Sequence, residues 1–174
     1  NAIGKIAAKY GADGVSVAYV RDGQVVDTYA YGSAVKGVRG MTSNTRVRVA
    51  SISKVLVGLA VQLAVEDGSF DLDADLGDYL GVDIRTRRAG DTVTPRSILT
   101  HTSSLTVAPE GTPCDLAAVR QRLTSSAGTR NVLSGNPGNW AYNNYAFSVL
   151  GMAVELAEQR TLDEILYESL YGPL

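Results

Sequence analysis

The chain has 174 residues, of which 45% are apolar and 20% are charged, which excludes a disordered tail, a collagen-like repeat and a coiled coil. Sixteen basic and eighteen acidic residues give a net charge of −2, which disfavours nucleic-acid binding through phosphate neutralisation. The single cysteine, Cys114, cannot form an intrachain disulfide, and the sequence holds no Cys/His cluster with zinc-ligand spacing. We therefore expect neither a metal nor a cofactor.

The first 50 residues predict a helix followed by a small antiparallel sheet. Asp22-Gly23 stands between two runs rich in β-branched and aromatic residues, a strong signal for a hairpin. The amphipathic spacing before these runs predicts a helix that ends at Gly11. The expected helix, two strands, polar loop and extended or strand-like entry segment are 1–10, 14–21, 24–32, 33–45 and 46–50.

The rest of the chain has mainly helical patterns. Between Lys54 and Glu66 the only polar side chain is Gln62, so we expect this helix to be buried on all sides at the centre of the fold. Thr161 and Glu164 form a capping-box pair at the start of the last helix. The expected helices, the second of them short, acidic and flanked by loops, are 52–66, 71–84, 95–99, 115–125, 145–159 and 161–171.

Ser51 and Lys54 are the first candidate site. A lysine in the first turn of an apolar helix is disfavoured as an ammonium both by burial and by the positive end of the helix dipole. Ser51 lies three residues earlier, on the same face of the turn, so its hydroxyl could give its proton to the amine. The alternative is a lysine whose stem simply reaches solvent from the helix end.

Tyr142 and Asn144 are the second candidate site. They precede an apolar helix and follow a loop rich in glycine and asparagine, which can present both side chains to one cleft. A phenol beside an ammonium can act as a general acid or base, and an amide can donate to and accept from a substrate amide. The alternative is that Tyr142 is a packed ring and that Asn143 or Asn144 only caps the helix.

Five stretches, taken in order, resemble the serine β-lactamase and penicillin-binding-protein superfamily, most closely its class C branch. They cover nearly the whole chain, and five ordered matches are more specific than any one motif. The stretches are GVSVAYVRDGQVVDTYAYG, RVRVASISKVLVGLAVQLAVEDGSFDLDADLGDYL, TPRSILTHTSSL, WAYNNYAFSVLGMAVE and YGPL. The resemblance implies an α+β (α/β sandwich) fold of the β-lactamase/transpeptidase type, with an antiparallel sheet plus a helical region.

The same resemblance implies roles for the candidate residues. Ser51 would be the acylated nucleophile, Lys54 its proton acceptor or electrostatic partner, Tyr142 the general acid/base and Asn144 a substrate-positioning residue. The implied function is a serine hydrolase that acts through an acyl-enzyme on β-lactam or D-Ala-D-Ala-type amides. A small-ester esterase of the same fold and a non-catalytic penicillin-binding-like module are the alternatives.

The chain departs from the family pattern in length and in one motif. Members are usually about twice as long, and their third motif, a Lys or His followed two residues later by Gly on a strand lining the cleft, is absent from this sequence. We therefore expect residues 1–174 to be one incomplete domain, with an N-terminal helix and strands in 1–50 and a mainly helical region in 51–174. The implied partners are the C-terminal remainder of the same protein, with its missing strands, and a small-molecule or peptidoglycan-peptide substrate. An extracytoplasmic location also follows from the resemblance alone.

Three other features have weaker functional interpretations. His101 is the only histidine, and no G-x-S-x-G turn accompanies it, which disfavours a Ser-His-Asp hydrolase; the resemblance implies a structural or supporting role. The aspartates between 71 and 78 lack EF-hand spacing and predict a solvated acidic turn. Cys114 has no neighbouring base in sequence, which disfavours a nucleophilic thiol.

Overall fold

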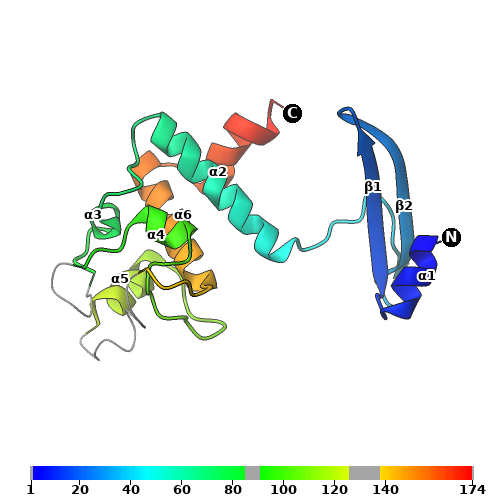
Figure 1. Ribbon diagram of the computed structural model, residues 1–174, viewed down its shortest axis with the longest axis horizontal. Helices are drawn as coiled ribbons and strands as arrows, with labels where there is room; N and C mark the ends of the chain where they lie inside the picture. Colours follow the sequence, from blue (N-terminus) through cyan, green and yellow to red (C-terminus); the bar gives the residue numbers. More distant parts are fainter. Residues whose placement is uncertain (1, 85–90, 126–137, 174) are drawn as a thin grey trace. The chain divides into compact units, whose positions relative to one another are not determined.

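The computed structural model describes residues 2–84, 91–125 and 138–173. The chain divides into two compact units, Asn1–Val49 and Ala50–Leu174, coloured dark blue and cyan to red in Figure 1. Among the described residues, no helix is both long and apolar enough to cross a membrane. Each unit is held together by its own internal contacts.

The first unit is a helix beside an antiparallel sheet. The helix α1 (Ala2–Lys9) precedes the strands β1 (Gly14–Arg21), β2 (Gln24–Val35) and β3 (Arg39–Gly40), which pair in that order. The predicted hairpin is confirmed. Asp22 and Gly23 both have positive φ, 51° and 73°, as a type I′ turn requires, and Arg21 pairs with Gln24 directly beside the turn.

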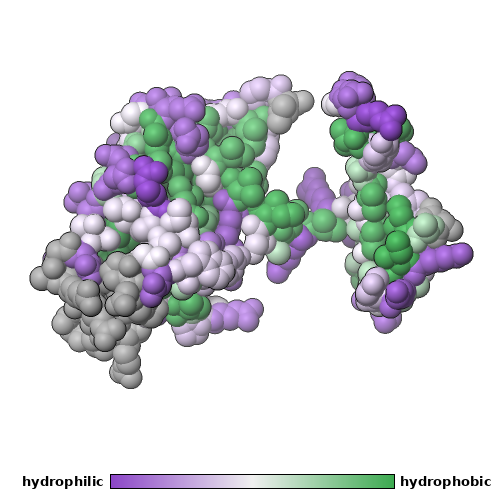
Figure 2. Space-filling model, viewed as in Figure 1, coloured by the Kyte–Doolittle hydropathy of each residue, from purple (hydrophilic) through white to green (hydrophobic). Residues whose placement is uncertain are grey.

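The prediction of a loop over residues 33–45 is wrong at its beginning. β2 continues to Val35 and turns back, because Gly37 adopts φ +72° and lets Val35 pair with Arg39. The glycine content of this segment indicated a loop, whereas Gly37 forms a second tight turn between β2 and β3. Figure 2 shows green surface over part of this unit, where large side chains of the hairpin strands are exposed. Those of β1 and β2 are Val17, Tyr19, Val20, Val25, Val26, Tyr31 and Val35.

The second unit is mainly helical, as predicted. Its elements, in chain order, are η1 (Ala50–Ile52), α2 (Ser53–Glu66), α3 (Leu76–Leu80), α4 (Pro95–Leu99), α5 (Leu116–Thr124), α6 (Asn144–Glu158), α7 (Leu162–Leu166) and the π-helical turn η3 (Tyr167–Tyr171). The capping box of Thr161 with Glu164 is confirmed, and Thr94 is the N-cap of α4, directly before Pro95. These caps satisfy N–H groups in the first turns of α7 and α4.

The central helix of this unit is α6, and the prediction that residues 52–66 are buried on all sides is wrong. α2, α3, α4 and α7 all pack against α6, and Val149, Leu150, Ala153 and Val154 are fully buried. α2 packs against α6 and α7 with one face only and leaves Val55 61% exposed. An all-apolar sequence indicates an affinity for other apolar surface, but the described part of this unit covers only one side of α2.

A strained serine lies in the turn that follows α4. Ser104 has φ +59° and is 5% exposed, and its hydroxyl has no hydrogen-bond partner among the described residues. Both features cost free energy, because a left-handed conformation is disfavoured for a residue with Cβ and a buried hydroxyl needs a partner.

Ser104→Gly is therefore expected to stabilise the protein by about 1 kcal/mol, raising Tm by roughly 2–4 °C in a thermal melt. The gain comes from relief of the strained φ and removal of the unpaired hydroxyl, less the extra chain entropy of glycine. Ser103→Gly is the matched control. Ser103 lacks a positive φ, and its Oγ accepts from the Leu105 N–H at 3.4 Å, so this change should lower Tm. Equal shifts for both variants would contradict the argument.

Candidate active site

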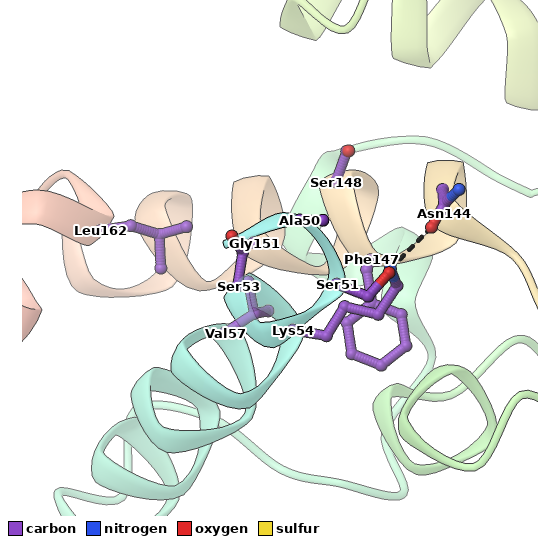
Figure 3. Close-up of a pocket in the computed structure, with 10 residues that line it drawn as sticks. All are labelled: Ala50, Ser51, Ser53, Lys54, Val57, Asn144, Phe147, Ser148, Gly151 and Leu162. Atoms are coloured by element: carbon purple, nitrogen blue, oxygen red, sulfur yellow. Dashed lines mark hydrogen bonds between the residues drawn. The ribbon is translucent and has the colours of Figure 1, made fainter. Parts of the chain in front are cut away.

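The structure brings the four predicted site residues together. Ser51 lies in η1, the 3₁₀ turn directly before α2, and Lys54 lies in the first turn of α2. Asn144 is the first residue of α6, and Tyr142 lies two residues before it. Figure 3 shows Lys54 and Asn144 pointing toward one another from α2 and α6. Packing of these two helices therefore joins motifs about 90 residues apart in the sequence.

Ser51 is the centre of a short hydrogen-bond network. Its Oγ lies 2.6 Å from Tyr142 Oη and 3.1 Å from Lys54 Nζ. Lys54 Nζ also donates to Asn144 Oδ1 at 2.6 Å and lies 4.7 Å from the centroid of the Tyr142 ring. The Lys54 side chain does not extend into solvent, as it would if it only reached the surface from the helix end. Its charged end is held between a hydroxyl, an amide oxygen and an aromatic face.

The phenol of Tyr142 is electrostatically tuned. Hydrogen bonding from the Lys54 ammonium, and then from the Ser51 hydroxyl, lowers the pKa of Tyr142 below its usual value, because both stabilise the phenolate. The ammonium also gives protons to Asn144 and Ser51, and the contact between Ser51 Oγ and Tyr142 Oη is a hydrogen bond in which either hydroxyl can be the donor. This geometry suits a phenolate that takes a proton from a serine hydroxyl.

The backbone around Ser51 is unusual. Ala50, directly before Ser51, has φ +47°, a left-handed conformation that a residue with Cβ adopts at a cost of about 1–3 kcal/mol. Ile52, the N-cap of α2, makes no side-chain capping hydrogen bond. The hydroxyl of Ser51 therefore lies at a helix N-terminus whose first N–H groups have no side-chain cap, where developing negative charge is favoured.

A cavity of about 490 Å³ opens beside this network. Its apolar lining is interrupted by hydroxyl groups, and Lys54 is its single charged lining residue among those described. The lining residues are Ala50, Ser51, Ser53, Lys54, Val57, Asn144, Phe147, Ser148, Gly151 and Leu162. The sequence pattern did not predict that Phe147, Ser148 or Gly151 would line a cavity at the site. Their spacing of three, four and seven residues from Asn144 was the available signal, because it places them on the same helix face.

The two asparagines before α6 have different tasks. Asn143 is the N-cap: its Oδ1 accepts from the Ala146 N–H at 3.1 Å, its Nδ2 donates to the Leu105 carbonyl at 2.7 Å, and it is buried. Asn144 is exposed and directed to Lys54. Asn143 is therefore the residue that caps α6, while its neighbour Asn144 contacts Lys54.

Asn143→Ala is expected to destabilise the protein by roughly 2–4 kcal/mol, because it removes a helix cap and leaves a buried carbonyl unpaired. Chemical denaturation followed by circular dichroism measures this. Asn144→Ala is the matched control and should cost less than about 0.5 kcal/mol, because its side chain is exposed. A larger stability loss in the Asn144 variant would show that the two tasks have been assigned in reverse.

The remaining candidates show structural roles. Although Cys114 is exposed, partial desolvation of its thiol raises the pKa of that thiol, which disfavours a reactive thiolate. Asp75 caps α3 by accepting from the Gly77 N–H, and Asp73 holds Arg96 through two hydrogen bonds of 2.7 Å. Within residues 2–84, 91–125 and 138–173, no group of three or more His, Cys, Asp or Glu is arranged to hold a metal ion.

Comparison with known proteins identifies the fold. A family model described as Beta-lactamase matches residues 1–174. An uncharacterised protein of Alkalihalophilus pseudofirmus is 24% identical over 155 residues, which are 88% of this chain and 40% of the relative. Among solved structures, a penicillin-binding protein homologue from Pyrococcus abyssi aligns with a TM-score of 0.81 and 21% identity over 98% of this chain and 41% of its own.

Two further solved structures have the same fold. A class C β-lactamase from Rhodobacter sphaeroides aligns with a TM-score of 0.77 and 22% identity, over 97% of this chain and 46% of its own. A D-amino acid amidase from Ochrobactrum anthropi aligns with a TM-score of 0.72 and 22% identity, over 95% of this chain and 48% of its own. The chain thus spans less than half the length of these proteins. The predicted β-lactamase/transpeptidase-like fold, with helices and an antiparallel sheet, is confirmed.

Proposed function

The chain belongs to the beta-lactamase family, and we propose that it carries the nucleophile of a serine hydrolase that forms an acyl-enzyme on Ser51. The observation that supports this most directly is the position of Ser51 Oγ, 2.6 Å from Tyr142 Oη and 3.1 Å from Lys54 Nζ. A surface serine has no structural need of two such partners. A nucleophile does, because one group must take its proton while a second group stabilises the charge that forms.

The proposed reaction begins with transfer of the Ser51 hydroxyl proton to the phenolate of Tyr142. Oγ then forms a bond to the carbonyl carbon of the substrate, and the carbonyl oxygen becomes an oxyanion. Collapse of this intermediate breaks the bond to the leaving group, which takes the proton back from Tyr142. Water hydrolyses the resulting ester by the same sequence of proton transfers. Lys54 keeps the phenolate available throughout, and Asn144 positions both the lysine and the substrate.

The proposed substrates are β-lactams or D-Ala-D-Ala-type amides. Support comes from the similar folds of a class C β-lactamase and a D-amino acid amidase, and from a cavity large enough for a small amide. A small ester is the second candidate, favoured by the apolar lining contributed by Val57, Phe147 and Leu162. A non-catalytic penicillin-binding-like module is the third.

A longer protein and an extracytoplasmic location complete the proposal. The solved relatives are about twice as long, and the resemblance to the family implies that a strand beyond the helical region would supply a second oxyanion donor. Loss of one such donor costs roughly 10²–10³ in rate, so we propose that the C-terminal remainder is a partner needed for full activity. Peptidoglycan peptides and β-lactams are met outside the cytoplasm, which is the reason for the proposed location.

Intact-protein mass spectrometry after exposure to benzylpenicillin or to p-nitrophenyl acetate tests this function. A gain of the whole penicillin mass, or of one acetyl group, mapped by peptide digestion to Ser51, is the expected result. An adduct from the ester alone would favour the esterase. The lifetime of a penicillin adduct separates a slow peptidase from a β-lactamase. Absence of any adduct, both on this chain and on a form that includes the proposed C-terminal remainder, would leave only the non-catalytic module.

A further inference from the structure

His101 binds the segment that carries Tyr142 through two hydrogen bonds and a ring contact. The backbone carbonyl of His101 accepts from the Ala141 N–H at 2.7 Å, and its side-chain Nδ1 accepts from the Asn143 N–H at 3.3 Å. Between these two bonds, the imidazole and phenol rings lie 4.6 Å apart, tilted by 40°. One residue therefore holds the backbone on both sides of Tyr142 and contacts the ring of Tyr142 as well.

The backbone of His101 indicates why a histidine stands here. His101 directly follows the C-cap of α4 and has φ +58°, a left-handed conformation for which glycine is the usual residue at a helix end. Keeping a side chain in this conformation costs of the order of 1 kcal/mol. The turn directs both the carbonyl and the imidazole of His101 to residues 141–143, so the side chain has a task that glycine could not perform.

We infer that His101, as a neutral imidazole accepting through Nδ1, is a positioning residue that sets the reach of Tyr142 to Ser51. The inference rests on the proposed function for its catalytic consequence, but not for its geometry. Tyr142 itself is 42% exposed, so packing alone does not fix its hydroxyl at 2.6 Å from Ser51 Oγ. A misplacement of about 1 Å at such a distance can cost up to about 10²-fold in rate.

The protonation state of His101 decides whether its side chain can accept the hydrogen bond from the Asn143 N–H. Nδ1 can accept only while it carries no proton, and an imidazolium would direct a donor at the Asn143 N–H. Burial, and then the charge of Lys54, lower the pKa of His101 below its usual value. The titratable groups that face the imidazole are Lys54, from α2, and Tyr142. The hydrogen bond from the Asn143 N–H to Nδ1 should therefore be present at neutral pH and be lost as the pH falls through the pKa of His101.

Two variants separate the accepting nitrogen from the aromatic ring. His101→Asn keeps an acceptor atom close to the place of Nδ1 and tolerates the positive φ, but it loses the ring. His101→Phe keeps a ring and loses the acceptor. Acylation by p-nitrophenyl acetate should fall roughly 10–100-fold in the Phe variant, mainly in the rate constant at saturation, and stay within about fivefold in the Asn variant. Besides the limb set by Tyr142, the wild-type pH–rate profile should fall more steeply below the pKa of His101, and this additional loss should be absent in the Asn variant.

A measurement without substrate tests the geometry by itself. His101 is the only histidine, so its ring nitrogens give one pair of ¹⁵N resonances. At neutral pH, the expected spectrum has a proton on Nε2 and none on Nδ1. A protonated Nδ1 would overturn the inference whatever the activity, and so would equal rate losses in the two variants. If neither this chain nor a form that includes the proposed C-terminal remainder takes an acyl group while Nδ1 is unprotonated, the proposed function fails but the inferred hydrogen bond at Nδ1 stands.

Discussion

Ser51→Ala is expected to lower the rate of acyl transfer by about 10⁴-fold or more and to abolish the covalent adduct with benzylpenicillin or p-nitrophenyl acetate. The hydroxyl oxygen is the atom that bonds to the substrate in the proposed reaction, so alanine leaves nothing in its place. Tyr142 and Lys54 would keep their positions but lose their common partner. Burst kinetics and intact mass measure the loss. The thermal stability should change by less than about 0.5 kcal/mol, because Ser51 is exposed.

Ser53→Ala is the matched control for this change. Ser53 lines the same cavity and lies two residues further along the chain, at the start of α2. Its hydroxyl has no part in the proposed reaction, so the rate should stay within about threefold of the wild type. An adduct that persists in the Ser51 variant, or one that disappears in the Ser53 variant, would assign the nucleophile to another side chain.

The sequence predicted the local geometry of the site better than the contacts between its parts. The spacing of Ser51 and Lys54 places them on one turn, and the structure has them 3.1 Å apart. No periodicity relates this pair to Tyr142 and Asn144, about 90 residues later, since that distance is set by the packing of α2 on α6. Only the resemblance to a family linked the two motifs before the structure did.

Other features could not be predicted because they depend on the backbone or on neighbours. The strained φ of Ala50 and the left-handed turn at His101 belong to residues with ordinary propensities, so the sequence carries no sign of them. Which asparagine caps α6 depends on whether a side chain meets Leu105 or Lys54. The apolar composition of α2 predicted burial, but how many faces are covered depends on what packs there.

The identity of the base that activates Ser51 gives the second large effect. Tyr142 and Lys54 both lie within hydrogen-bond distance of Ser51 Oγ, and the sequence leaves the choice between them open. If the Tyr142 phenolate is the base, the rate is present above the pKa of Tyr142 and is lost as the pH falls through it. Because the Lys54 ammonium lowers that pKa, its removal should shift the limb of the profile to higher pH.

Lys54→Met is therefore expected to lower the acylation rate by roughly 10²–10⁴-fold at neutral pH and to recover part of it at alkaline pH. Lys54→Arg keeps a positive charge near the phenol but cannot act as a base, so its profile should stay close to the wild-type position with a smaller loss. Tyr142→Phe should lose the limb altogether. pH–rate profiles of the three variants with p-nitrophenyl acetate, corrected for its spontaneous hydrolysis, measure these shifts.

The opposite assignment makes a different set of predictions. A neutral Lys54 amine acting as the base would be lost equally in the Met and Arg variants, and no alkaline pH could restore it, because neither side chain can take a proton there. The two Lys54 variants thus decide between an amine that accepts the proton and an ammonium that tunes its neighbour. We propose the second assignment, because Tyr142 Oη lies 2.6 Å from Ser51 Oγ, closer than Lys54 Nζ at 3.1 Å, and hydrogen bonding from Lys54 lowers the pKa of Tyr142.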